Sequence, residues 1–355
     1  MFTPSRLTLA RKRRRLTKKA LAEQVDVTAH TVLRYESGDI APTDETLGKL
    51  SSVLRFPIEF FSEPDVDALP EDAASFRSMS TMSAKERDAA LAAGSLAYLF
   101  ADWVEQRFGL PNFDLIDLEG DSPEVAARSL REKWWLGEKP IKNMAQLLEF
   151  KGIRLFSMAE STMTVDAFSV WRGEQPYVFL NTMKSAERSR HDAAHELGHL
   201  ILHKHGGPQG RRAEEEAEQF ASSFLMPQAD VEATIPRVHS LNQIIEAKKR
   251  WGVSVMSLIV RLGRLGILSE WQYRTFAIQA TEAGYRKSEP FGLPRELSVV
   301  WQKVLTALWN ERVTKEEIAR QLYVPAEEIE NLLFGIVGQR GGGDSTDLRP
   351  PLRLV

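Results

Sequence analysis

Hydrophobic residues recur three or four positions apart along most of the chain, and at alternate positions in one shorter region. The wider spacing predicts amphipathic helices, because about 3.6 residues complete a helical turn. Alternation predicts strands, which we place at residues 152–156, 167–171 and 177–180, the last two joined as a hairpin about Arg172-Gly173. The pattern therefore predicts a mainly α protein with a small β-sheet, which is an α+β fold.

Composition divides this pattern into segments. A chain of 355 residues is long enough for two or three domains. Residues 63–84 are rich in Pro, Asp and Ser, as linkers are, and Gly341-Gly342-Gly343 predicts a flexible end. The predicted order is a helical bundle at 1–62, a linker at 63–84, a larger α+β domain at 85–275, a helical C-terminal extension at 276–340 and a flexible tail at 341–355.

The absence of cysteine limits the chemistry of the chain. It excludes disulfides, thiolate metal sites and a cysteine nucleophile, so a tightly bound metal needs histidine and carboxylate ligands. No apolar run approaches the ~18 residues that span a bilayer, and no apolar segment follows the basic N-terminus as it does in a signal peptide. We therefore expect a cytoplasmic protein that does not enter a membrane.

The first segment has the pattern of a helix-turn-helix. Thr17 is expected to cap one helix, Asp26-Val27 to make a tight turn, and Thr28 to cap a second helix that ends at Ser37-Gly38. Two short helices joined by such a turn place the second one in the major groove of DNA. The side chains expected to reach bases or phosphates are Thr28, Ala29, His30, Thr31 and Arg34.

Basic residues at the N-terminus support a polyanionic partner. The first 20 residues contain no acid, although the net charge of the chain is -3. We expect Arg13, Arg14 and Arg15 to bind the backbone of double-stranded DNA, which positions a protein without reading sequence. A solvated helix face is the alternative explanation of this charge. A palindromic operator would in addition imply a homodimer.

Residues 16–54 resemble the Xre/Cro-type helix-turn-helix family over their whole length. The resemblance implies a DNA-binding domain, and the alternative is a small bundle for protein contacts or dimerisation. The positions that carry the resemblance are Leu16-Thr17, Ala22, Val27, Tyr35-Glu36-Ser37-Gly38 and Pro42.

The most specific local pattern is His195-Glu196-Leu197-Gly198-His199. Residues four apart share one face of a helix, so both histidines can bind one metal ion. Glu196 stands beside them, where it can take a proton from an attacking water and later pass it to the leaving amine. The apolar neighbours predict a buried helix, in which two histidines need partners. An accidental occurrence on an ordinary helix is the alternative.

Two histidines leave a catalytic zinc one protein ligand short. The next predicted helix, at residues 214–227, offers several glutamates. Glu214 shares the inward face with Ala217 and is the candidate third ligand, while Glu216 remains its rival. Glu218 can orient a ligating histidine by accepting a hydrogen bond from its second ring nitrogen.

Both helices resemble the ImmA/IrrE family of metallopeptidases, a gluzincin-like group. The strings RSRHDAAHELGHLILH and EEEAEQFASSFLMP carry the resemblance, which covers the whole predicted α+β domain. It implies a minimal gluzincin-like metallopeptidase domain with zinc bound by His195, His199 and Glu214, and with Glu196 as the catalytic base. The family usually has Asn or Asp where this chain has Glu218.

Further side chains are candidates for stabilising the charge that develops on a substrate carbonyl. His191 and His203 each lie one turn from a histidine of the motif, and His205 and Tyr177 are the other candidates. Each is equally well explained as an ordinary structural residue. Residues 177–181 also predict either an edge strand that holds a substrate peptide by strand addition or a plain core strand.

This combination predicts a transcriptional regulator, of the kind found in stress response and toxin–antitoxin systems, with a zinc endopeptidase that cleaves a specific protein such as a repressor or antitoxin. The alternatives are a non-proteolytic regulator or antitoxin that senses a metal or ligand, and an interaction protein with a structural zinc. The C-terminal extension repeats the helix-turn-helix rhythm, but Glu327, Glu328 and Glu330 suit phosphates poorly. We expect packing or dimerisation there.

Overall fold

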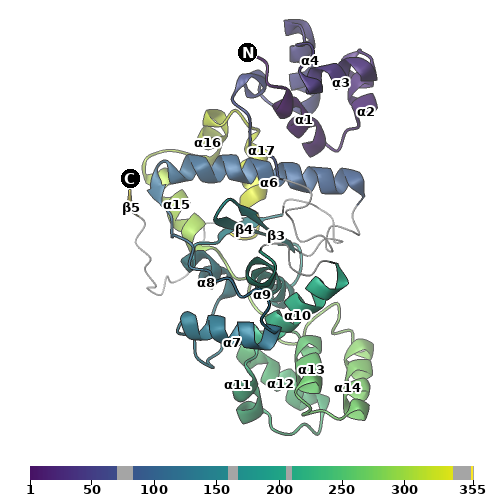
Figure 1. The fold of residues 1–355 in the computed structure, drawn as a ribbon, viewed down its shortest axis with the longest axis vertical. Helices are drawn as coiled ribbons and strands as arrows, with labels where there is room; N and C mark the ends of the chain where they lie inside the picture. Colours follow the sequence, from purple (N-terminus) through teal and green to yellow (C-terminus); the bar gives the residue numbers. More distant parts are fainter. Residues whose placement is uncertain (70–82, 159–166, 205–209, 339–352, 355) are drawn as a thin grey trace.

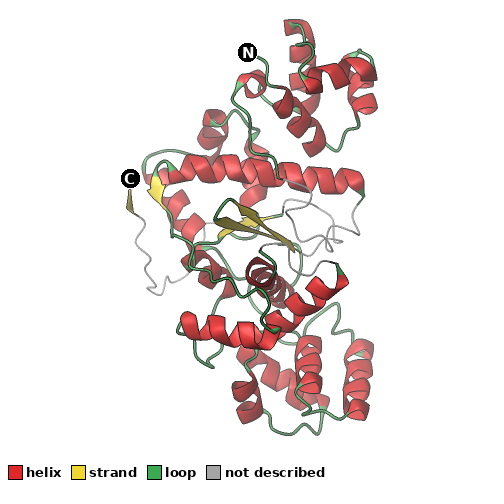
Figure 2. Cartoon of the chain, in the orientation of Figure 1, coloured by secondary structure: helices red, strands yellow, loops and turns green. Residues whose placement is uncertain are grey.

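The computed structural model describes residues 1–69, 83–158, 167–204, 210–338 and 353–354. Helices dominate this part of the chain, and a three-stranded sheet lies near its centre (Figure 2). The predicted α+β class is confirmed. The molecule is elongated, with the N-terminal helices at one end and the helices between residues 228 and 282 at the other (Figure 1).

The N-terminal bundle contains the predicted helix-turn-helix. Thr17 accepts a hydrogen bond from the amide of Ala20, and Thr28 accepts one from the amide of Thr31, which confirms both predicted helix starts. Asp26 makes the turn in the left-handed conformation, which Asp tolerates better than most residues. The elements of the bundle are α1 (Pro4–Arg13), α2 (Lys18–Val25), α3 (Ala29–Ser37), α4 (Asp44–Leu54) and the 3-10 helix η1 (Ile58–Ser62).

A long helix, α6 (Ala84–Glu105), crosses the molecule between the bundle and the sheet (Figure 1). Ser83 and Glu86 form a capping box at its start, which fixes where the helix begins after the predicted linker. The helix contacts both α1 and the C-terminal helix α17 (Ala326–Leu333). It therefore connects the two ends of the sequence.

The sheet contains β2 (Arg154–Ser157), β3 (Ala167–Arg172) and β4 (Gln175–Leu180), in the order β2-β4-β3. Strand β4 pairs in parallel with β2 and antiparallel with β3. Of the two alternatives for residues 177–181, the structure supports the core strand and not the edge strand, because β4 has a neighbour on each side. Among the described strands, β3 is the edge strand on the hairpin side.

Alternation along these strands divides the interior into two cores. Phe168 and Phe179 stack at 4.5 Å on the face toward α6 and belong to a core shared with the N-terminal bundle. Ala167 and Leu180 face the other way, into a second core around the helix α9 (Ala186–Leu202). The remaining helices of this side are α7 (Pro123–Lys133), α8 (Met144–Phe150), α10 (Arg211–Leu225), α11 (Gln228–Thr234), α12 (Leu241–Trp251), α13 (Val255–Arg264) and α14 (Glu270–Glu282).

The C-terminal helices return to the first core. Trp301 packs against Phe156 of the sheet with ring centroids 5.0 Å apart, and α17 contacts both α6 and β2, as the expected packing role requires. The predicted boundary at residue 275 falls inside α14, which packs on α13 and α12. The helices of this final group are α15 (Val299–Asn310), α16 (Lys315–Gln321) and α17.

Most of the predicted flexible tail lies outside the described residues. Its residues Arg353–Leu354 are described, as a short strand β5 that pairs antiparallel with β1 (Phe108–Gly109). Two residues of the tail therefore pair with the body of the chain. Among the described helices, none combines the length and the apolar character that crossing a membrane requires.

Candidate metal centre

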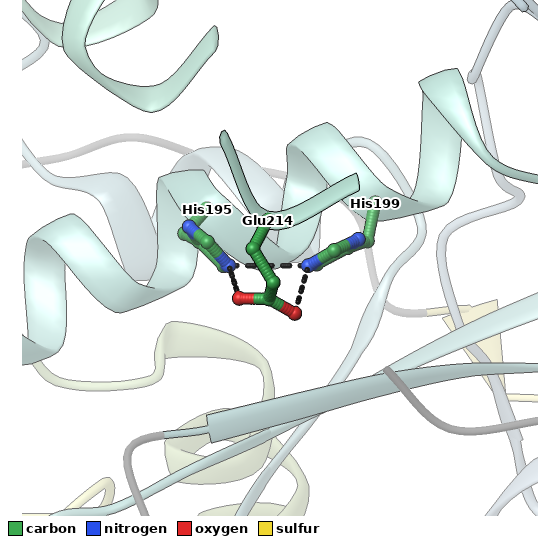
Figure 3. A group of neighbouring side chains, drawn as sticks. All are labelled: His195, His199 and Glu214. Carbon is green, nitrogen blue, oxygen red and sulfur yellow. Dashed lines mark hydrogen bonds and ion pairs between the residues drawn. The ribbon is translucent and has the colours of Figure 1, made fainter. Parts of the chain in front are cut away.

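Helix α9 presents His195 and His199 on one face, one turn apart, and α10 brings Glu214 over them (Figure 3). The two helices approach closely because Gly198 has no side chain. A Cβ at that position would lie 3.0 Å from Cδ1 of Phe220 and 3.2 Å from Cα of Ala217. Because the helices are this close, the carboxylate of Glu214 can contact both His195 and His199.

The three side chains have the spacing that a tetrahedral zinc requires. His195 Nε2 lies 3.1 Å from His199 Nε2, and the two carboxylate oxygens of Glu214 lie 3.3 Å and 3.5 Å from these nitrogens. Two ligands that are each about 2.1 Å from a tetrahedral zinc are about 3.4 Å apart. Two imidazoles and one carboxylate also leave the fourth position open, as in catalytic zinc sites. The residues therefore fit this metal.

The electrostatics keep Glu214 ionised. Burial alone would raise the pKa of this carboxyl, but hydrogen bonds and charge from His195 and His199 outweigh burial and hold the pKa well below its usual range. A carboxylate must be deprotonated to bind a metal, so Glu214 is in the required state.

The second ring nitrogen of His199 contacts His203, which in turn contacts Glu216. Its Nδ1 lies 3.0 Å from Nδ1 of His203, and His203 Nε2 lies 3.2 Å from Oε2 of Glu216. Burial lowers the pKa of His203, against the opposing hydrogen bond to Glu216. A neutral His203 that accepts at Nδ1 and donates at Nε2 satisfies both contacts. Glu216, the rival third ligand, therefore contacts His203, whereas Glu214 contacts the two histidines of the motif.

His195 has a corresponding carboxylate partner in Glu218. One oxygen of Glu218 lies 3.8 Å from His195 Nδ1, and the other lies 3.4 Å from Nε2 of His191. Burial would raise the pKa of Glu218, but the charge and hydrogen bond of His191 outweigh it and lower the pKa to about 2. Glu218 is therefore ionised and lies nearer to His191 than to His195, at a distance from His195 that is too long for a direct hydrogen bond.

The face predicted to contact DNA is open to solvent. Val32 and Tyr35 turn inward from α3 and are buried, with 0% and 6% of their surface exposed. Ala29, His30 and Arg34 are exposed on the opposite side, and Thr31 is half-buried. Thr28 is exposed as well, although its hydroxyl is used as the N-cap of the helix. The structure therefore brings the predicted contact residues of α3 onto one surface.

Two family models match the chain at these two sites. Residues 7–61 match the helix-turn-helix model, and residues 148–263 match the peptidase family M78 model, described as the IrrE N-terminal-like domain. The chain carries both domains. The architecture is therefore an Xre-type helix-turn-helix domain followed by an IrrE-like peptidase domain, as the sequence predicts. No curated protein matches the chain.

In the IrrE-like domain, Glu196 has a partner that the sequence analysis missed. Ser169 of β3 donates a hydrogen bond from its hydroxyl to Oε2 of Glu196, at 2.7 Å. Both residues are buried, with 4% and 3% of their surface exposed. The available signal was a polar residue at an inward position of an otherwise apolar strand, AFSVW.

A cleft of about 660 Å³ opens at the metal site. Its lining includes His191, His195, Glu196 and the two carboxylates Glu214 and Glu218. The segment after α14, which the sequence analysis assigned to the C-terminal extension, also lines it. The lining residues of that segment are Tyr285, Arg286, Lys287 and Glu289.

Of the predicted carbonyl-stabilising candidates that the structure describes, His191 lines this cleft, whereas Tyr177 and His203 do not. Tyr177 is 1% exposed and packs edge-on against Tyr98 at 4.6 Å, on the face of the sheet that belongs to the first core. The prediction that Tyr177 serves the site is therefore wrong, because strand alternation directs it away from α9. His205 lies outside the described residues.

The helix-turn-helix domain uses two of its predicted phosphate-binding arginines internally. Arg13 Nε lies 2.7 Å from Oε2 of Glu328, and both side chains are almost fully buried. Arg14 pairs with Glu327 at 2.7 Å and with Glu328 at 3.2 Å, and its guanidinium also lies over Phe56. The structure contradicts a phosphate-binding role for Arg13 and Arg14, because the acidic helix α17 already neutralises them. Arg15 is half-buried.

Proposed function

We propose that this chain is a DNA-binding regulator whose IrrE-like domain is a zinc-dependent endopeptidase, and that it cleaves a specific protein such as a repressor or antitoxin. The observation that carries the proposal is the convergence of His195, His199 and Glu214 at zinc-ligand spacing. Two of them, His195 and Glu214, line a cleft that Glu196 also lines. A closed structural zinc would need a fourth protein ligand, and the described residues of this cluster supply three.

The side chains have separate roles in this proposal. His195, His199 and Glu214 would hold the zinc, which when bound supplies Lewis acidity to a water molecule and to the peptide carbonyl. Glu196 accepts a proton from the attacking water and delivers it to the amide nitrogen of the leaving fragment. Glu218 and His203 fix the ring orientation of the two histidines.

Substrate binding follows from the position of β3. This strand carries Ser169 beside Glu196, and its pairing partner β4 occupies one of its two edges. An extended peptide that adds to the other edge would run past Glu196 and be held by main-chain hydrogen bonds. The side chains that line the cleft would then select the substrate sequence, which suits cleavage of one specific protein.

The helix-turn-helix domain would bring this activity to DNA. Its exposed residues His30 and Arg34 on α3 would contact base edges or phosphates in the major groove. Because Arg13 and Arg14 are already paired, backbone contacts would come from other residues of the domain.

The test compares wild-type protein with Glu196→Gln in the proteome of the source cells. New protein N-termini are labelled and identified by mass spectrometry after zinc-loaded protein is added to the lysate. We expect one protein, or very few, to gain a new N-terminus with wild type and none with Glu196→Gln. Glu215→Gln is the matched control, since Glu215 lies on α10 and pairs with Arg211 at the surface.

Identical N-termini in both samples, with zinc bound to both proteins, would contradict the peptidase proposal. That result would favour a regulator or antitoxin that binds zinc without turnover. Zinc content is therefore measured on each preparation.

A further inference from the structure

The strand β3 carries one polar residue on the face that covers α9. Ala167 and Trp171 share this face, and the Trp171 indole donates to the backbone carbonyl of Leu200 on α9. Ser169 lies between them and is 4% exposed. A buried hydroxyl without a partner costs about 1–3 kcal/mol, so the identity of its acceptor is informative.

The acceptor is the carboxylate of Glu196. Ser169 Oγ lies 2.7 Å from Glu196 Oε2 and 3.4 Å from the Glu196 backbone carbonyl oxygen. A hydroxyl has one proton to donate, and the shorter contact to a carboxylate is the stronger of the two. The hydrogen bond therefore engages one of the two carboxylate oxygens, Oε2.

Ser169 lies on a paired strand whose neighbouring side chains are buried. Its register partner on β4 is Val178, and Phe168 and Val170 on either side are anchored in the first core. A hydroxyl on a paired strand has little freedom to move, whereas Glu196 has rotatable bonds of its own. The strand therefore fixes the carboxylate, and not the reverse.

We propose that Ser169 is the positioning residue for Glu196. Its hydroxyl holds Oε2 and directs the other carboxylate oxygen to the donor that occupies the cleft. This inference rests on the proposed function, in which that donor is the attacking water. Both contacts of the Ser169 hydroxyl are to Glu196, so Ser169 would act through Glu196.

The test measures how zinc-loaded protein binds acetohydroxamate, a small chelator whose hydroxyl proton is accepted by a carboxylate next to the metal. The variants are Ser169→Ala, Ser169→Thr and Glu196→Gln. Ser157→Ala is the matched control, because Ser157 is a buried serine of the same sheet that bonds to Thr182. Calorimetry gives the hydroxamate affinity, a competing chelator gives the zinc affinity, and thermal unfolding gives Tm.

We expect Ser169→Ala to weaken hydroxamate binding about tenfold, as the loss of a hydrogen bond to a charged group implies. Ser169→Thr keeps the hydroxyl and should restore most of the affinity. Zinc affinity should be unchanged in all variants, and Ser157→Ala should bind hydroxamate like wild type. If Ser169→Ala does not fold, Ser169→Cys replaces it, because a thiol of similar size is a weak donor.

Two results would overturn the inference. Wild-type hydroxamate affinity in Ser169→Ala, with a loss in Glu196→Gln, would show that Glu196 needs no positioning. A matching loss of zinc affinity in Ser169→Ala would show that Ser169 supports the metal ligands. Wild-type affinity in Glu196→Gln is a different failure, since it would remove Glu196 from the cleft chemistry and overturn the proposed base as well.

Discussion

The sequence predicts a functional site both in the metal-site helices α9 and α10 and at the basic end of α1. The side chains that interact in these two regions are differently separated along the chain. In α9 and α10 the interacting side chains are neighbours in sequence, with His195 and His199 four positions apart. In α1 the partner of Arg13 is Glu328, which is 315 positions away. Helical geometry dictates the first arrangement, and only the complete fold creates the second.

The difference also separates two meanings of clustered charge. Around Glu214 the partners are histidines at ligand distance beside a cleft, so the cluster can take a metal ion from outside the chain. Around Arg13 the charge is cancelled by a glutamate of the same chain, and nothing further is needed. A basic block in a sequence therefore indicates an anionic partner, and that partner can be an acidic helix of the same protein.

The largest expected effect is on the long-range pair. Glu328→Ala leaves the buried guanidinium of Arg13 without its partner and should lower the free energy of unfolding by about 3–5 kcal/mol. Urea denaturation measures the change. Glu330→Ala, at an exposed position of the same helix, should change stability by less than about 0.5 kcal/mol. Equal effects of the two substitutions would mean that the pair between α1 and α17 does not hold the domains together.

A second long-range contact, between α8 and the start of α15, should make the free energy of unfolding depend on pH. Glu149 of α8 accepts hydrogen bonds from the Ser298 hydroxyl and from the amides of Val299 and Val300 at the start of α15. Burial raises the pKa of Glu149 to about 7, despite these hydrogen bonds. The folded state thus binds the proton more tightly than the unfolded state, where the pKa is near 4.5. The stabilisation is fully present below the unfolded pKa and is lost as pH rises through the folded one.

The measurement compares wild type with Glu149→Gln by urea denaturation between pH 4.5 and pH 8, a window set by these two pKa values. Relative to the variant, wild type should lose up to about 3 kcal/mol of unfolding free energy across this range. A difference between the two proteins that stays constant with pH would show that Glu149 does not titrate there.

The next expected effect is on zinc binding by the metal-site residues of α9 and α10. Glu218→Ala removes the carboxylate that faces Nδ1 of His195 and should weaken zinc binding about tenfold, as loss of an outer partner of a metal ligand does. Competition with a fluorescent zinc chelator measures the affinity. Glu215→Ala on the same helix should leave it unchanged. Equal zinc affinity in both variants would show that Glu218 does not orient His195.

The smallest expected effect concerns Arg13, which pairs with Glu328 and is compared with the exposed Arg34. Arg34→Ala should weaken binding to duplex DNA about tenfold, since a specific side-chain contact is worth roughly 1–3 kcal/mol. The pair Arg13→Met with Glu328→Leu should leave the salt dependence of binding unchanged. Fluorescence anisotropy over a salt series measures both. A decrease of about 0.9 in the slope of log K against log salt would instead reveal a phosphate contact by Arg13.

Patterns within one helix predicted the site best. The spacing of His195 and His199, the inward position of Glu214 and the caps at Thr17 and Thr28 all follow from the helical period, and the structure agrees with each. Such features need no knowledge of distant residues.

Features that depend on how elements assemble were not predicted. The period of two shows that Tyr177 and Phe179 share a face of β4, but not which face looks toward α9. Ser169 was missed for the same reason, because the period of two does not show that its face of β3 covers α9. The segment after α14 lines the cleft through tertiary packing alone, and so does the pairing of Arg13 with Glu328.

The most direct test of the account is the zinc content of purified protein, measured by elemental analysis for wild type, Glu214→Ala and Glu216→Ala. The account predicts about one zinc per chain in wild type, as a three-ligand catalytic site binds one ion. That zinc should be lost with Glu214→Ala and kept with Glu216→Ala, because Glu216 bonds to His203. Absence of zinc from wild type, even after zinc is supplied, or loss with Glu216→Ala alone, would contradict it.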